Sequence, residues 1–391
     1  MPNYKYLIIG GGMTADAAIV GIREVDPNGS IGLISAESHP PYNRPPLSKG
    51  LWKGKPLETI FRQASKDYAQ LHLGTTVDSI DPEKKLATDT QGQSYNYEKL
   101  LLATGGSPRE LPFGSGEIIY FRKLDDFHKL HSLIGEGTRF AVIGGGFIGS
   151  ELAAALRDQG QDVVMLFPEE GIGSLLFPSD LATYLNDYYR QKGVEVMSGE
   201  LVNGFEKQNE RISLKTKSGK DIVVDHVVAG IGIIPNTSLA ERAGIEVENG
   251  IVVNQFLQTN QPDIYAAGDV ASIYNPILDM RMRVEHEDNA LIGGKSAGRN
   301  MAGELSPYDH LSYFYSDLFE LGYEAVGKLN PNLETFADWS EPYHKGVVYY
   351  LDQGQLRGVL LWNVWDQVDS ARKLITETGP FTTAYLKGRL P

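Results

Sequence analysis

The sequence predicts an α/β protein in which one strand–turn–helix unit occurs twice, followed by a smaller C-terminal α+β domain. An apolar run at residues 4–9 leads into the turn Gly10-Gly11-Gly12, and residues 140–143 lead in the same way into Gly144-Gly145-Gly146. Aromatic residues crowd together after about residue 308, where the composition changes. Repetition of a whole unit is harder to produce by chance than either turn alone.

The first turn has the spacing of a dinucleotide-binding fingerprint. Gly10, Gly12 and Ala15 fit the pattern GxGxxG/A, and a helix is predicted over residues 14–25. The first glycine allows the tight turn, the second lets the backbone approach a pyrophosphate, and the small third residue allows close helix–strand packing. The pattern therefore predicts a Rossmann-like unit with an anion at the start of the helix.

An acidic residue follows the next predicted strand, residues 30–35. Glu37 lies twenty-two positions after Ala15, where a carboxylate would accept hydrogen bonds from ribose hydroxyls. The alternative is a glycine-rich loop with an ordinary surface glutamate. The complete order of strand, turn, helix, strand and acid favours the nucleotide site.

A proline-rich segment at residues 41–49 presents two cations, Arg44 and Lys49. Prolines reduce the conformational freedom that is lost on ordering, so these cations could be held against a ligand at modest entropic cost. Taken alone, such a segment is more often a rigid surface loop.

Short strands are predicted near residues 75–80 and 85–88, before a buried strand that ends in Ala-Thr-Gly-Gly at residues 103–106. Such an ending lets backbone approach a cofactor, although a plain tight turn explains it as well. Residues 107–116 are rich in Pro, Gly and Ser and indicate a crossing between domains, and a helix is expected over residues 125–134.

The second fingerprint comprises Gly144, Gly146 and Gly149, and the acid that follows the next strand is Glu169 or Glu170. An acid at this place repels the 2′-phosphate of NADPH, which favours NADH.

Glu151 lies two residues beyond the second fingerprint, in the first turn of the expected helix. An acid in a first turn is stabilised by the helix macrodipole by about 0.3–1 kcal/mol wherever it occurs. Position alone therefore gives Glu151 no special role.

The second unit continues with a helix at residues 180–192 and ends in a glycine-containing turn at residues 229–232, like the first. A buried strand beginning at residue 264 ends in Gly-Asp, and Asp269 could bond a polyol hydroxyl or cap a helix. The last part has predicted strands and a helix at residues 323–329, 346–351, 355–362 and 368–376.

Composition restricts the possible functions. No apolar run approaches the roughly 20 residues that span a bilayer, and the first strand begins near Tyr6 without room for a leader, so we expect a cytoplasmic protein. The chain has no cysteine, which excludes disulfides, thiolate metal sites and a redox cysteine pair. The formal charge of −14 disfavours nucleic-acid binding and, more weakly, an acidic protein partner.

Three motifs together resemble the FAD-dependent pyridine nucleotide oxidoreductases: the paired fingerprints, Ala-Ala-Gly-Asp at residues 266–269 and Arg-Pro-Pro-Leu-Ser-Lys at residues 44–49. Within them the chain is similar to apoptosis-inducing factors and to bacterial ferredoxin and rubredoxin reductases. The resemblance implies a glutathione-reductase-like fold, with a discontinuous FAD domain (1–112 and 233–308), an inserted NAD domain (113–232) and a C-terminal α+β domain (309–391).

The resemblance also implies two sets of cofactor residues. Non-covalently bound FAD would be held by Gly10, Gly12, Met13, Thr14, Ala15, Glu37, Arg44, Lys49, Val77, Arg122, Asp269, His286, Glu287 and Tyr315. NADH would be held by Gly144, Gly146, Phe147, Ile148, Gly149, Glu169, Gly232, Glu285, Glu324 and Asn363. No metal site is expected.

By the same resemblance, Lys49 and Glu151 would pair near the reactive flavin nitrogen, where a cation stabilises negative charge as hydride arrives. Phe147 would gate the nicotinamide. Tyr315 stands where the family commonly has a Trp facing the flavin, so contact with a reduced nicotinamide would be weaker.

These observations predict an enzyme that passes hydride from NADH to flavin and then electrons to an external acceptor: a quinone, oxygen or a small iron–sulfur protein. A dedicated ferredoxin or rubredoxin reductase is one alternative, although it needs a cationic docking face. The other is an NADH-responsive redox sensor that acts through a protein partner. A homodimer is possible.

Overall fold

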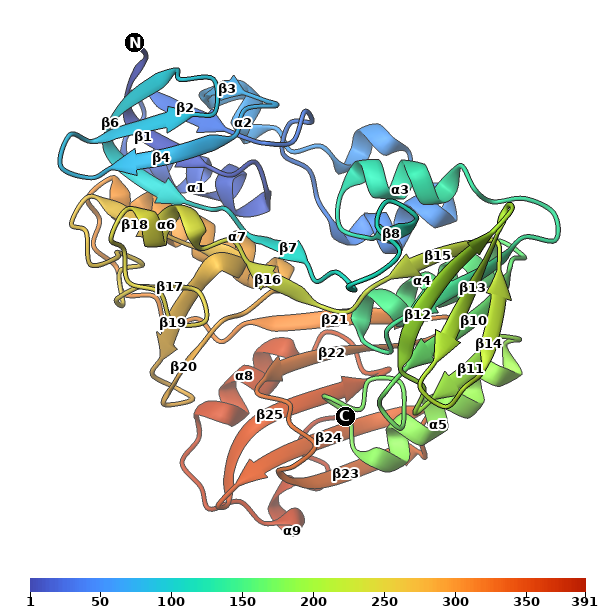
Figure 1. The fold of residues 1–391 in the computed structure, drawn as a ribbon. Coiled ribbons are helices and arrows are strands. Elements are labelled where there is room, and N and C mark those ends of the chain that lie inside the picture. Colours follow the sequence, from blue (N-terminus) through green and yellow to red (C-terminus); the bar gives the residue numbers. More distant parts are fainter. The chain divides into compact units, whose positions relative to one another are not determined.

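Parallel strands that end in glycine turns lie at the centre of both compact units of the chain. A computed structural model describes residues 1–391, coloured along the sequence in Figure 1. The first unit contains residues 1–44, 56–107 and 234–314, and the second contains residues 45–55, 108–233 and 315–391. The three-domain assignment made from the sequence stays a prediction, as does the cytoplasmic location. No helix is long and apolar enough to cross a membrane.

The first unit is built on a seven-stranded sheet of order β3-β2-β1-β6-β5-β4, with β18 paired to β6. The β1, β2, β3, β6 and β18 strands pair in parallel, whereas β4 and β5 form an antiparallel extension. Their bounds are β1 Asn3–Ile9, β2 Ile31–Ile34, β3 Gln70–His72, β4 Val77–Asp81, β5 Leu86–Asp89, β6 Ser94–Leu102 and β18 Ile264–Ala266. Buried aliphatic side chains such as Leu7, Leu33 and Leu101 form the core of this sheet.

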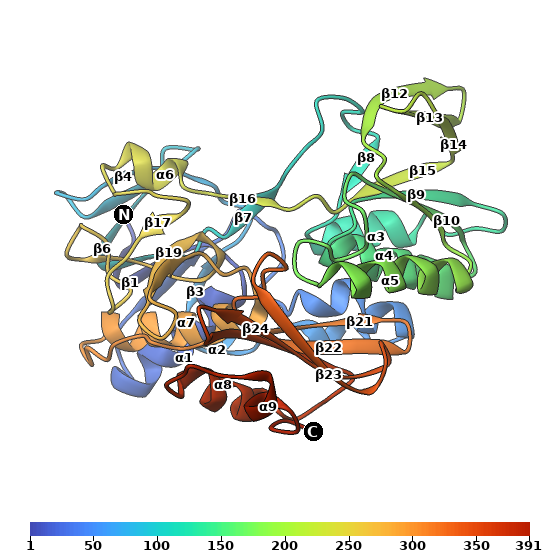
Figure 2. The ribbon, with the colours of Figure 1, turned by 90° about the horizontal axis from the view of Figure 1, so that it is seen from below.

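Two helices of this unit, α1 (Met13–Val25) and α7 (Glu287–Met301), pack against each other almost backbone to backbone, as Figures 1 and 2 show. A Cβ on Gly298 would come within 3.0 Å of the carbonyl oxygen of Ala18, and one on Gly294 within 3.0 Å of that of Thr14. The glycines of α7 therefore let it approach the helix that starts at the first fingerprint.

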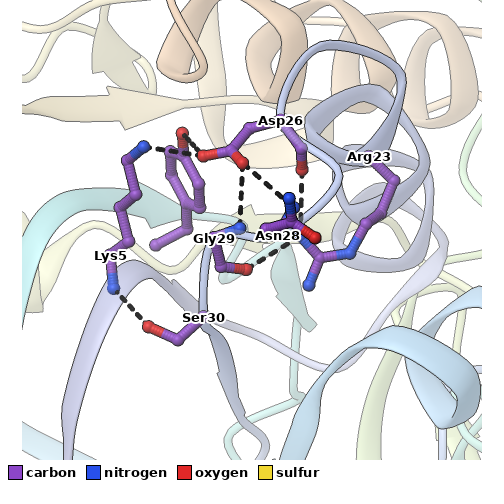
Figure 3. A network of polar contacts seen from close by, with 7 residues as sticks. Lys5, Arg23, Asp26, Asn28, Gly29 and Ser30 are labelled. Atoms are coloured by element: carbon purple, nitrogen blue, oxygen red, sulfur yellow. Dashed lines mark hydrogen bonds and ion pairs between the residues drawn. The ribbon is translucent and has the colours of Figure 1, made fainter.

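The turn between α1 and β2 is closed by Asp26, which accepts four hydrogen bonds (Figure 3). Its Oδ2 accepts from Lys5 Nζ at 2.7 Å and from the Tyr6 hydroxyl at 2.9 Å, and its Oδ1 accepts from the backbone N–H groups of Asn28 and Gly29. The hydrogen bond from Lys5, helped by the two backbone donors, holds the pKa of Asp26 well below its usual value.

The second unit repeats the parallel arrangement in a five-stranded sheet of order β11-β10-β9-β15-β8. Its strands are β8 Ile118–Tyr120, β9 Arg139–Ile143, β10 Asp162–Phe167, β11 Glu195–Ser198 and β15 His226–Ala229. Its helices are α3 Leu124–His131, α4 Phe147–Asp158 and α5 Ser179–Gln191. A separate antiparallel sheet contains β12 Val202–Gln208, β13 Arg211–Thr216 and β14 Asp221–Val224.

The C-terminal part of the second unit is a five-stranded sheet of order β21-β22-β25-β24-β23. Its strands are β21 Tyr313–Leu318, β22 Leu321–Gly327, β23 Glu334–Glu341, β24 Lys345–Asp352 and β25 Gln355–Trp362. Helix α8 (Val368–Thr376) packs on β22 and β25 and lies along one face of the sheet in Figure 2. The predicted α/β class, with an α+β part at the C-terminus, is confirmed.

Short elements complete the chain. They are η1 Pro45–Ser48, η2 Gly50–Lys53, η3 Leu57–Ile60, α2 Ala64–Tyr68, β7 Gly106–Pro108, β16 Ile233–Pro235, α6 Ser238–Arg242, β17 Ile251–Val252, η4 Gly268–Val270, β19 Ala271–Asn275, β20 Met280–Met282 and α9 Thr383–Leu386. The β7 and β16 strands, which pair with each other, contain two of the five points at which the chain passes from one unit to the other.

Candidate functional site

The two glycine turns have nearly the same backbone conformation. Gly12 precedes α1 with φ −91° and ψ −172°, and Gly146 precedes α4 with φ −86° and ψ −163°. A Cβ on either residue would meet nothing within 4 Å, so both turns present open backbone at the start of a helix. Such an opening, with helix N–H groups at its floor, suits the pyrophosphate of a dinucleotide.

The first glycine of each turn is required by a neighbouring strand end. Gly10 has φ +121° and Gly144 has φ +115°, which favour glycine over residues with a side chain. A Cβ on Gly10 would come within 3.0 Å of the carbonyl oxygen of Ala103, and one on Gly144 within 3.0 Å of that of Gly230. The Ala103 and Gly230 strand ends, which the sequence marked as similar, therefore lie at equivalent places in the two units.

Glu37 is held in place by the proline-rich segment that follows it. The Tyr42 hydroxyl donates to Glu37 Oε2 at 2.6 Å, and Arg44 Nη2 donates to Oε1 at 2.6 Å. Burial alone would lower the pKa of Arg44, but the negative charges of Glu37 and Asp269 raise it above its usual value. The segment thus brings a fixed cation to the acid of the first fingerprint.

Asp269 belongs to the same cluster because its turn packs on the first helix. Gly268 has φ +75°, and a Cβ there would come within 3.0 Å of the Thr14 hydroxyl. The backbone oxygen of Asp269 accepts a hydrogen bond from Arg283 Nη1 at 3.1 Å, and Arg283 also pairs with Glu285 at 2.5 Å. Asp269 is the middle residue of the short helix η4, and its negative charge raises the pKa of Arg44.

His286 occupies the N-cap position of α7, immediately before Glu287, and its ring stacks on Phe314, with ring centroids 4.2 Å apart and planes at 18°. Burial lowers the pKa of His286 to about 4, so the imidazole is neutral at pH 7. A neutral, stacked ring is a flat surface for a cofactor rather than a charged ligand.

The second unit contains a buried carboxylate with three donors. Glu151 Oε1 accepts from Lys49 Nζ at 2.6 Å and from the Ser316 hydroxyl at 2.5 Å, and Oε2 accepts from the Ser48 hydroxyl at 2.5 Å. The Glu151 side chain is 3% exposed and that of Lys49 is 14% exposed. The Lys49 ammonium also lies 5.2 Å from the centre of the Tyr315 ring. The predicted partners Lys49, Glu151 and Tyr315 therefore lie together.

The expected place of Glu151 in the first helical turn was wrong. Helix α4 begins at Phe147, earlier than the fingerprint spacing suggested, and its first turn contains no acidic residue. Since the macrodipole acts mainly on the terminal turn, it does not account for this buried carboxylate. The donors from Ser48, Lys49 and Ser316 do.

An aromatic cluster surrounds the same region of the second unit. The Tyr323 ring stacks on Trp362 at 5.7 Å and 7°, contacts Phe177 edge-on at 5.2 Å, and lies 6.5 Å from half-buried Phe147. Burial, together with the charge of Glu151, raises the pKa of Tyr323 well above 10.

The remaining residues predicted for NADH are spread through both units. Ile148 follows Phe147 in α4, and Glu169, after β10, accepts from the Gly199 N–H at 2.8 Å through its backbone oxygen. Gly232 has φ +90° and Glu285 lies in the first unit.

Glu324 and Asn363 lie in the C-terminal sheet region. Glu324 Oε2 is buried without a hydrogen-bond partner, and burial together with Asp366 raises the pKa of this carboxyl. The Asn363 side chain accepts from the Gly322 N–H at 2.7 Å and donates to the His344 oxygen at 2.9 Å, which fixes the amide.

Two residues predicted for FAD contribute through less distinctive contacts. Val77 is buried at the start of β4, and the Arg122 N–H donates to Asp126 at the start of α3. No group of three or more His, Asp or Glu side chains is arranged to hold a metal ion.

The sequence did not identify three polar residues of this site: Ser48, Ser316 and Tyr323. Ser48 lies inside the motif at residues 44–49 and Ser316 follows Tyr315, but such a position gives no indication of the partner of a serine. Their bonds to Glu151 join residues 103 and 165 positions apart.

The sequence profile of the pyridine nucleotide-disulphide oxidoreductases matches residues 4–297, three quarters of the chain. The chain belongs to this family. A second profile, the C-terminal domain of mitochondrion-associated apoptosis-inducing factor, matches residues 297–342 and 337–377. This chain has no cysteine, so it cannot reduce disulfides through a cysteine pair.

Several oxidoreductases resemble the chain over nearly its whole length. Apoptosis-inducing factor 1, mitochondrial, of Dictyostelium discoideum is 38% identical over 95% of this chain and 78% of its own. Putidaredoxin reductase of Pseudomonas putida is 30% identical over 97% and 93%. A crystal structure of a covalent putidaredoxin reductase–putidaredoxin complex superposes with a TM-score of 0.91, at 30% identity over 99% and 96% of the chains. This oxidoreductase is accordingly a flavoprotein that transfers electrons from a nicotinamide nucleotide to a partner.

Proposed function

We propose that the chain uses NADH, in preference to NADPH, to reduce a bound FAD whose reactive ring lies beside Lys49. The observation that carries this proposal is the buried Lys49–Glu151 pair, 2.6 Å apart, in the unit that also contains the second glycine turn. A buried ion pair is costly to build, because both charges lose their hydration. A functional need for a fixed cation at this place explains why the protein keeps a buried ion pair despite the lost hydration.

Within this proposal, the two glycine turns have different cofactors. FAD is held at the first turn, where Glu37, Arg44 and Asp269 form a connected cluster. NADH is held at the second turn, which is equally open at Gly146. The stacked, neutral His286 supplies a flat contact for the flavin side of the site.

Lys49 has an electrostatic role in this mechanism. FAD, when bound, would supply the hydride-accepting ring, and the Lys49 ammonium would be a preorganised cation that stabilises the negative charge developing there. Glu151 holds the ammonium, and the Tyr315 ring lies over it at 5.2 Å. Phe147, half-buried at the start of α4, gates the place of the nicotinamide.

The preference for NADH rests on Glu169. Its carboxylate follows β10, where it would accept hydrogen bonds from the ribose and repel a 2′-phosphate. Replacing Glu169 by Ala is expected to raise the KM for NADH and to narrow the preference over NADPH. An unchanged ratio of kcat/KM for the two nucleotides contradicts this assignment.

A small iron–sulfur protein is a second, more specific candidate for the electron acceptor. The similarity to putidaredoxin reductase in its complex with putidaredoxin favours it. Docking of such an acceptor needs a face of exposed cations, and two arginines that could contribute to one already have partners within the first unit. Arg281 Nη1 donates to the Ser272 oxygen at 2.6 Å, and Arg283 pairs with Glu285. Reduction of an iron–sulfur protein that slows with added salt supports this candidate, whereas faster reduction of quinone or oxygen favours a small acceptor.

The alternative of an NADH-responsive sensor predicts a different behaviour. A long-lived complex of reduced flavin with oxidised nucleotide, and a change in sedimentation on adding NADH, would favour it. Fast turnover with an acceptor and no change in sedimentation would contradict it.

The test of the main proposal is stopped-flow reduction of the Lys49→Ala variant by NADH. We expect FAD to remain bound and its reduction to slow by about 10²-fold, the order seen when one electrostatic group is removed from an active site. The matched control is Lys215→Ala, since Lys215 forms an exposed pair with Glu206 at 2.7 Å. Equal reduction rates in the two variants would contradict the role of Lys49.

A further inference from the structure

The Glu151 carboxylate lies at the centre of a hydrogen-bonded group that joins Lys49 to two serine hydroxyls. Its Oε1 accepts from Lys49 and Ser316, and its Oε2 accepts from Ser48. We propose that the Ser48 and Ser316 hydroxyls position the Lys49 ammonium through Glu151. This inference rests on the proposed function, in which Lys49 acts on the flavin.

The two serines restrict how the carboxylate can rotate. The terminal torsion of a glutamate has broad preferences, so one ion pair alone leaves the carboxylate plane poorly fixed. Ser48 binds Oε2 and Ser316 binds Oε1, and both hydroxyls are buried. With one donor on each side, only one orientation satisfies all the donors, and that orientation places Oε1 2.6 Å from Lys49 Nζ.

The direction of the hydrogen bonds follows from the chemistry of the groups. An ionised carboxylate only accepts, so Ser316 must give its single hydrogen to Glu151. The Ser48 hydroxyl gives its hydrogen to Oε2 in the same way.

The aromatic cluster of the same unit is rigidly packed. The Tyr323 ring stacks on Trp362 and meets Phe177 edge-on, and all three rings are at most 2% exposed. The hydrogen bonds of Glu151 connect three elements, the end of η1, helix α4 and strand β21. Positioning of this kind matters because a displacement of about 1 Å at a reacting centre can cost about 10²-fold in rate.

The test replaces each hydroxyl separately. Ser316→Ala and Ser48→Ala are each expected to slow flavin reduction by NADH about tenfold or more, the equivalent of one hydrogen bond to a charged group, with FAD affinity unchanged. Tyr323→Phe is expected to have a smaller effect, since Ser316 can still donate to Glu151. Ser316→Thr keeps the hydroxyl and should restore most of the rate.

A matched control exists in the antiparallel sheet of the same unit. The Ser218 hydroxyl donates to Glu200 at 2.8 Å, and Glu200 pairs with Lys220 at 2.6 Å, so the same chemistry occurs far along the chain from the fingerprints. Ser218→Ala should leave the reduction rate unchanged. For Tyr323→Phe the control is Tyr350→Phe, which removes a hydroxyl bonded to the Leu176 oxygen at 2.8 Å.

The second readout is the midpoint potential of the bound flavin. A less well placed cation stabilises reduced flavin less, so the potential should become more negative in Ser316→Ala and Ser48→Ala and recover in Ser316→Thr. Rates and potentials equal to those of Ser218→Ala would overturn the inference. If only Lys49→Ala changes them, the proposed function stands and the positioning by hydroxyls is wrong; if Lys49→Ala changes neither, the role of Lys49 fails as well.

Discussion

Removal of either member of the Lys49–Glu151 pair should destabilise the protein far more than removal of both. Breaking a buried ion pair costs about 3–5 kcal/mol, because one charge stays buried without its partner. After Lys49→Met, Glu151 keeps the hydroxyls of Ser48 and Ser316. After Glu151→Leu, the ammonium keeps the ring of Tyr315, a contact of about 0.5–2 kcal/mol, and two hydroxyls lose their acceptor. We therefore expect Glu151→Leu to be the more costly change.

The double variant removes both charges, and its cost should fall well below the sum of the single costs. A double-mutant cycle of urea unfolding is expected to give a coupling free energy of about 2 kcal/mol or more. The control cycle uses Lys215 and Glu206, which are 2.7 Å apart with side chains 46% and 52% exposed, and should give a much smaller coupling free energy, because solvent screens an exposed pair. Equal coupling in the two cycles would refute the reasoning from burial.

Other predictions concern the first unit. Asp26→Asn should cost about 1–3 kcal/mol at neutral pH, because Asp26 accepts four hydrogen bonds there. The pKa of Asp26 is lowered in the folded state. The stabilisation is therefore present above about pH 4 and is lost as the pH falls through the folded pKa. The unfolding free energy of the variant should thus fall less steeply with decreasing pH than that of the wild type, and equal slopes would contradict this. Gly298→Ala should lower the unfolding free energy by about 1–3 kcal/mol, because its Cβ would collide with the Ala18 oxygen; calorimetry that shows no change would argue against the close helix contact. Glu37→Ala should weaken FAD binding while leaving the fold intact, and retention of FAD on dialysis at the wild-type level would contradict the assignment.

The glycine turns and most strands could be predicted because their determinants are local. The strand, turn and helix of the first fingerprint lie within residues 3–25, and the acid follows the next strand. The structure places the first helix at Met13–Val25 and the corresponding strand at Asn3–Ile9, within one residue of the prediction. Repetition of the unit then made the fold class predictable.

Helix α7 was not predictable from the sequence, and the reason is physical. Its sequence contains Gly293, Gly294 and Gly298, and glycine disfavours helix by about 1 kcal/mol relative to alanine. The same glycines allow the backbone contact with α1, a tertiary interaction that no local pattern shows. Packing therefore outweighs propensity in this helix.

The Lys49–Glu151 pair was predicted from the family resemblance, whereas the two serine donors to Glu151 were found only in the structure. Ser48 lies next to Lys49 in the chain, but Ser316 reaches Glu151 across 165 positions. The sequence predicted Lys49 as the cation of the site. The orientation of its ammonium depends on partners that only the fold brings together.

The most direct test of the account is anaerobic mixing of the purified flavoprotein with one equivalent of NADH or of NADPH, followed by its absorbance spectrum. The account predicts that the protein contains one FAD and that NADH bleaches it faster than NADPH does. Electrons should then pass to an added acceptor. A protein without flavin, or a bound flavin that NADH leaves oxidised, would contradict the central claim.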